Sequence, residues 1–103
     1  MLPANLSDVE ILTKVRAIAV GKGTIAWTTH ALVRMSERGI AQDDVKACLA
    51  NGHFEERPNI PNRSGNLEYE FKMKATIDSE PLAVVASLKT ENRILVITAI
   101  TEP

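Results

Sequence analysis

The chain has 103 residues, of which 45% are apolar and 24% are charged. This length and composition predict one folded domain over residues 1–103 and exclude a disordered or fibrous chain. The formal net charge of −1 provides no overall attraction to polyanions, so contact with nucleic acid would need a local basic patch.

Cysteine content and hydropathy predict a cytoplasmic protein. The single cysteine, Cys48, has no partner for an internal disulfide, and the first residues lack the apolar segment of a secretion signal. The longest apolar runs, 82–88 and 94–100, are far shorter than the roughly 20 residues of a membrane-spanning helix. We therefore expect no membrane contact.

The first predicted element is a helix over about residues 8–20. Ser7 and Glu10 have the spacing of a capping box, in which each side chain binds the backbone N–H of the other residue. A glycine-rich segment ends this helix. Residues 24–28 are β-branched and aromatic and predict a short strand, with Trp27 anchored in the core.

A second helix is predicted between a cap at Thr28 or Thr29 and a stop at Gly39. At about 100° per residue, this central helix has two distinct faces. One face is charged and carries His30, Arg34, Glu37 and Arg38. The other is apolar and carries Ala31, Leu32 and Met35.

A third helix follows at once, and its first turn carries the carboxylates that a helix N-terminus favours, Asp43 and Asp44. Its apolar side predicts burial of Val45, Cys48 and Leu49. Cys48 is therefore expected to be an inert core thiol. Asn51 and Gly52 can adopt the left-handed conformation that closes a helix.

The rest of the chain is predicted to form strands joined by loops. Residues 53–57 predict an edge strand, 58–66 a loop, and 67–75 a strand with strict apolar and polar alternation. The runs 82–88 and 94–100 lack alternation, which is typical of strands buried on both faces. The predicted class is α+β, with three helices packed on a mostly antiparallel sheet of four to five strands.

Candidate chemistry is confined to basic side chains. The sequence has no motif for a cofactor, and its histidines, His30 and His53, are too few to predict a metal site. Arginine suits phosphate, and a nearby histidine could move a proton during attack of a ribose 2′-OH on the adjacent phosphodiester. This hypothesis makes the catalytic residues His30, Arg34 and Arg38. RNA-binding residues would be Lys72 and Lys74, on the polar face of the alternating strand.

A family resemblance rests on the central helix. The pattern His30-Ala-x-x-Arg-Met-x-x-Arg-Gly-Ile40, followed by Asp44-Val45, Leu49, Gly52 and Val96-Ile-Thr98, resembles the bacterial family of domain of unknown function 4258. That resemblance implies a relation to the RelE/ParE-type toxins, small α+β proteins many of which cut mRNA and are silenced by an antitoxin. It implies a RelE-like fold and action on RNA or the ribosome.

The order of elements is also similar to the motility quorum-sensing regulator toxins, which are mRNA interferases of that superfamily. Where those proteins carry lysine, glutamine and tyrosine for cleavage, this chain has acidic or apolar residues near Glu55 or Glu56, Glu70 and Val84. The basic excess of RNA-cutting toxins is also missing.

Two functions therefore stay open at the level of sequence. The first is a toxin-related domain acting on RNA through His30, Arg34 and Arg38. The second is a non-catalytic interaction domain, in which the arginines pair with carboxylates such as Glu37 or Glu55 and the partner is an antitoxin or a second copy. An exposed cationic face beside a hollow would favour the first function, and bonded arginines would favour the second.

Overall fold

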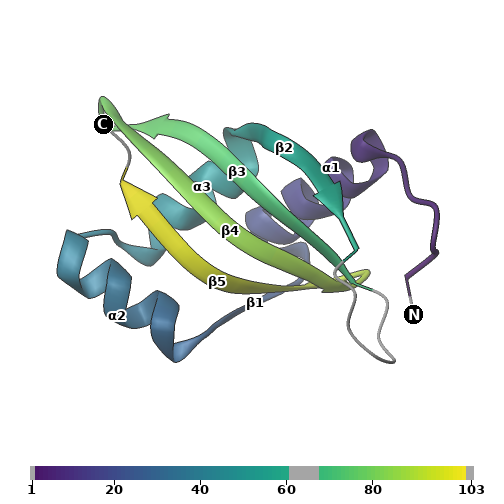
Figure 1. Ribbon diagram of the computed structural model, residues 1–103, viewed down its shortest axis with the longest axis horizontal. Helices are drawn as coiled ribbons and strands as arrows, with labels where there is room; N and C mark the ends of the chain where they lie inside the picture. Colours follow the sequence, from purple (N-terminus) through teal and green to yellow (C-terminus); the bar gives the residue numbers. More distant parts are fainter. Residues whose placement is uncertain (1, 61–67, 102–103) are drawn as a thin grey trace.

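The computed structural model describes residues 2–60 and 68–101 and has an α+β fold (Figure 1). Its elements, in chain order, are the helix α1 (Asp8–Ala17), the π-helical turn η1 (Ile18–Lys22), β1 (Thr24–Trp27), α2 (Thr29–Arg38), α3 (Gln42–Asn51), β2 (His53–Asn59), β3 (Tyr69–Ile77), β4 (Glu80–Thr90) and β5 (Arg93–Thr101). The predicted class and the three helices are confirmed.

The strands form one five-stranded mixed sheet in the order β1-β5-β4-β3-β2. Neighbours pair antiparallel except β1, which lies parallel to β5. Asp78 and Ser79 have φ angles of 51° and 70°, and they join β3 to β4 in a two-residue turn across the pair Ile77 and Glu80. Positive φ at both central residues suits the twist of a tight hairpin.

Helices α1 and α3 lie side by side behind the sheet, whereas α2 lies next to β5 (Figure 1). The core fills the space between the sheet and the helices, and α3 contributes Val45, Cys48 and Leu49 to it. All three are buried as predicted. β3 contributes Tyr69, Phe71 and Met73.

Strand faces follow the predicted alternation in β3 but not the predicted two-sided burial in β5. The helix-facing side of β3 is buried at Tyr69, Phe71 and Met73. Glu70, Lys72 and Lys74 on its other face are only half-buried. In β5, Ile94 and Val96 are buried, but Leu95 and Ile100 are half-buried. The prediction for β5 was wrong, because α1 and α3 cover only one face of the sheet (Figure 1). For the central strand β4 it is confirmed, since all of residues 82–88 except Val85 are buried.

Side chains fix the start of α1. Ser7 Oγ accepts from the N–H of Glu10 at 3.1 Å, and Glu10 Oε1 accepts from the N–H of Ser7 at 3.1 Å, which confirms the capping box. The bond from the Ser7 backbone is also the largest cause that lowers the pKa of the Glu10 carboxyl, followed by the Ser7 side chain. The segment before α1 is held by Tyr69, whose hydroxyl accepts from the N–H of Leu6 at 3.1 Å and donates to the carbonyl of Pro3.

The α3–β2 junction differs from prediction. Gly52 has a φ of −79°, which is not left-handed. Glycine is needed there for space, because a Cβ would lie 2.6 Å from the carbonyl oxygens of both Cys48 and Lys74. β2 then runs to Asn59, two residues into the predicted loop 58–66, most of which lies outside the described residues. Within residues 2–60 and 68–101, no helix is long and apolar enough to cross a membrane.

Candidate functional site

The central helix α2 begins and ends where the sequence predicts. Thr28 Oγ1 accepts from the N–H of Ala31 at 3.0 Å, and Gly39 ends the helix with a left-handed φ of 66°. Thr28 also joins α2 to the sheet, because its hydroxyl donates to the carbonyl of Ile97 at 3.0 Å. The start of α2 is thus fixed against β5.

The apolar face of α2 is narrower than predicted. Ala31 and Met35 are buried, but Leu32 is 43% exposed and the neighbouring Val33 is 51% exposed. The reason is geometric: α2 packs mainly against β5, and a helix beside one strand buries only a narrow stripe. The prediction for Leu32 was therefore wrong.

Arg38, predicted to be catalytic, bonds to the backbone of the sheet. Its Nη1 donates to the carbonyl oxygen of Ala99 in β5 at 3.1 Å. β1 pairs with β5 only as far as Val96, and α2 lies beside the rest of that strand (Figure 1). The guanidinium thus satisfies a carbonyl that would otherwise point away from the sheet without a strand to bind it.

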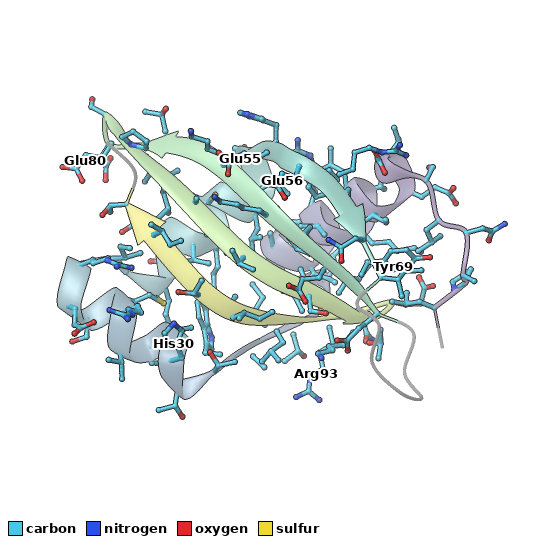
Figure 2. All side chains as sticks on the ribbon, viewed as in Figure 1. His30, Glu55, Glu56, Tyr69, Glu80 and Arg93 are labelled. Atoms are coloured by element: carbon cyan, nitrogen blue, oxygen red, sulfur yellow. The ribbon has the colours of Figure 1, made fainter. Side chains whose placement is uncertain are left out.

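Arg34 and His30 lie on the exposed side of α2. Arg34 Nη1 lies 3.4 Å from Glu37 Oε1, and both side chains are about half exposed. An exposed ion pair of this kind contributes about 0.2–1 kcal/mol. His30, in the first turn of the helix, is exposed, and its side chain makes no hydrogen bond or ion pair with any other described residue (Figure 2).

The two lysines predicted to bind RNA share one carboxylate. Lys72 Nζ lies 2.7 Å from Glu55 Oε2, and Lys74 Nζ lies 3.7 Å from Glu55 Oε1. Glu55 comes from β2, at the far edge of the sheet from α2 (Figure 2). β4 and β5 lie between these lysines and α2, so the structure does not bring the predicted RNA-binding and catalytic residues together.

A hollow of about 240 Å³ lies beside Arg38 at one end of the sheet. Its polar lining includes three carboxylates, from Asp44, Asp78 and Glu80. The three negative carboxylates repel a phosphate more strongly than the single guanidinium of Arg38 attracts it. Neither His30 nor Arg34 lines this hollow.

Cys48 is buried as predicted. Its thiol lies 3.6 Å from the carbonyl oxygen of Met73 and 3.8 Å from that of Leu82. Burial raises the pKa of the Cys48 thiol from its ordinary 9.0 to about 12, so the thiol stays neutral at physiological pH. A neutral thiol is a poor nucleophile. In the part of the chain that the structure describes, no three His, Cys, Asp or Glu side chains are grouped to hold a metal ion.

Arg16 has a structural role that sequence reasoning missed. From α1, its guanidinium donates to the carbonyl of Ala50 and, at 2.9 Å, to that of Gly52. These carbonyls lie at the C-terminal end of α3, where backbone acceptors lack helical partners. A basic residue in the last turn of an amphipathic helix looks solvent-facing in sequence, and no local signal identifies a partner on another helix.

The profile of the family described as Domain of unknown function (DUF4258) matches residues 27–101. The match begins at the last residue of β1 and ends at the last residue of β5, so it contains α2, α3 and four of the five strands in full. Neither a curated protein nor a solved structure gives a match.

Proposed function

We propose that this chain, which belongs to the DUF4258 family, is a non-catalytic protein-binding domain in which α2 has a structural role beside the sheet. The observation that carries this proposal is the hydrogen bond from Arg38 to the Ala99 carbonyl. This bond gives the Arg38 guanidinium a structural partner in the sheet backbone, and three carboxylates line the hollow beside it, which disfavours a phosphate there.

Three of the other basic residues that the sequence suggested for RNA support the same conclusion. Arg34 is paired with Glu37, and Lys72 and Lys74 flank the Glu55 carboxylate. Their positive charge is offset locally, and the formal net charge of the whole chain is −1. Attraction to RNA depends on clustered basic charge, which this arrangement does not supply.

A protein partner also accounts for apolar side chains on the surface of α2. Leu32 and Val33 are adjacent and about half exposed on the side of α2 that does not pack against β5. Apolar side chains of this kind form the buried centre of protein interfaces. Such a partner is an antitoxin-like chain or a second copy of this domain.

A second candidate is a RelE-like, toxin-related function on RNA or the ribosome. One observation favours it: His30 and Arg34, four residues apart, are both exposed on α2. In this case His30 would move the proton of the attacking 2′-OH and Arg34 would bind the phosphate.

Overexpression in bacterial cells separates the two functions. We would compare the wild type with Arg34→Ala and with Arg57→Ala, a matched arginine whose exposed pair is with Asp8. A protein-binding domain leaves growth and the mapped 5′ ends of cellular RNA unchanged in all three strains. Growth arrest with new RNA ends, relieved by Arg34→Ala but not by Arg57→Ala, would overturn the proposal in favour of the second candidate.

A further inference from the structure

The outer edge of β1 carries backbone groups that no strand of the sheet binds. The N–H of Thr24 donates to the carbonyl of Asn92 at 2.8 Å, and the N–H of Thr28 donates to that of Val96 at 3.1 Å, so both face β5. Backbone groups alternate in direction along a strand. Those of Ile25 and Trp27 therefore point away from β5, and Figure 1 shows no element beyond β1 on that side.

A hollow of about 260 Å³ lies next to this edge. Its walls include three apolar side chains from β1 and η1, those of Ile18, Ile25 and Trp27. Ile25 and Trp27 are only half-buried, although they lie on the helix-facing side of the sheet, in register with the buried Ile94 and Val96. The hollow can take one apolar side chain from a strand laid along β1.

The charge around this hollow is basic. Lys46, from α3, is exposed and lines the hollow, and none of the lining residues is acidic. Lys22, at the end of η1, is exposed immediately before β1. Val20 in the same turn is 65% exposed. These surroundings favour a ligand that combines apolar and carboxylate side chains.

We propose that β1 accepts an extended segment of a partner protein as an additional strand, with one apolar side chain in the hollow and a carboxylate at Lys46. Backbone hydrogen bonds to Ile25 and Trp27 would hold the segment, and the hollow would select its side chains. A second copy is the poorer occupant, because pairing β1 with β1 brings the Lys22 and Lys46 side chains of both copies together. This inference rests on the proposed protein-binding function and adds the edge of β1 to the exposed apolar side chains of α2 as a contact surface.

The test begins with random dodecapeptides displayed on phage and selected on the full chain. Trp27 is the single tryptophan, so its fluorescence reports binding of each synthetic peptide at this edge. We expect apolar and acidic peptides that change Trp27 emission and protect the amides of Ile25 and Trp27 from hydrogen exchange. The hydrogen-exchange measurement uses the wild type, so it does not depend on whether a variant folds.

Variants then locate the contact. Ile25→Pro removes one outward N–H without removing a bond to β5, and proline is tolerated at such edge positions. We expect it to weaken peptide binding about tenfold or more, and Ile25→Ala, which keeps the N–H, to weaken binding less. Lys46→Glu should weaken binding about tenfold, whereas Arg57→Glu at the opposite edge should not.

Three results would overturn the inference. They are the recovery of no peptide, binding that leaves the two amides unprotected, and a concentration-dependent dimer that is lost in Ile25→Pro. The proposed function is tested separately, by growth and by the 5′ ends of cellular RNA. Failure of this surface is therefore distinguishable from failure of the protein-binding function itself.

Discussion

The two edges of the sheet are protected in different ways. β2 carries charged residues, a proline at Pro58 and two register shifts against β3, all of which discourage a further strand. β1 is the uncharged run Thr24–Trp27, and its only protection is its length of four residues. Beyond β1, the same edge of β5 is covered by α2 through Thr28 and Arg38.

The difference shows what the central helix does. Where β1 ends, the side chains of Thr28 and Arg38 take the place of a strand as hydrogen-bond donors to the backbone of β5. The charge of Arg38 therefore stabilises the sheet. The short uncovered stretch between η1 and α2 is then the place where the sheet can still accept a strand. The following predictions test this contrast, from the largest expected effect to the smallest.

Alkylation of Cys48 should report how well each edge protects the core. With its pKa raised to about 12, the folded thiol should react with iodoacetamide at pH 8 on the order of a thousand times more slowly than the thiol of the urea-unfolded chain. Gly52→Ala should speed alkylation more than Gly23→Ala, because Gly52 packs against the Cys48 carbonyl. Equal rates in folded and unfolded protein would contradict the burial of this thiol.

The same thiol makes stability depend on alkaline pH. The unfolded thiol loses its proton near its ordinary pKa of 9.0, whereas the folded thiol keeps its proton up to about pH 12. Ionisation therefore favours the unfolded state first, and the free energy of unfolding should fall as the pH rises from about 9 towards 12. Urea denaturation should show a smaller fall in Cys48→Ala.

Each edge strand begins after a glycine that has no room for a side chain. A Cβ on Gly23 would lie 2.3 Å from the Asn92 carbonyl oxygen, and one on Gly52 would lie 2.6 Å from two such oxygens. Gly23→Ala and Gly52→Ala should each lower the free energy of unfolding by about 2–3 kcal/mol. Ser36→Ala, on the exposed surface of α2, is the control and should change it by less than about 0.5 kcal/mol.

Arg38→Ala should lower the free energy of unfolding by about 1–2 kcal/mol, because it leaves the Ala99 carbonyl without its charged donor. Arg38→Lys should recover part of this loss. Arg34→Ala on the same helix should cost less than about 1 kcal/mol, as for other exposed pairs. An Arg38 variant as stable as the wild type would mean that α2 does not protect β5.

The smallest effect is expected at the β2 edge. Glu55→Gln removes the charge that lies between Lys72 and Lys74, and it should lower the free energy of unfolding by about 0.2–1 kcal/mol. Because these side chains are partly exposed, added salt should reduce the difference from the wild type. A difference that does not change with salt would indicate a role in packing.

Sequence reasoning succeeded where the cause of a structure is local. Helix α2 begins at the Thr28 cap and ends at Gly39 in the αL conformation, as predicted. The alternation from Tyr69 to Met73 identified the half-buried strand β3. Capping and periodicity depend on neighbours within a few residues.

Sequence reasoning failed where a side chain contacts a residue far along the chain. The exposure of Leu32 depends on which side of α2 packs against β5, and the partners of Arg16 and Arg38 are backbone carbonyls on other elements. No spacing rule identifies such carbonyls, since every residue carries one. The structural role of Arg38, the last residue of α2, was therefore not predictable from the sequence.

The parallel pairing of β1 with β5 has a kinetic consequence. It joins Thr24 to Arg93, whereas β2 to β5 pair with strands that adjoin them in the chain. Closing so large a loop is entropically slow, so this contact should form last during refolding and open first during native-state fluctuations. On the ribosome, β1 has no partner strand until residues 93–96 have been synthesised.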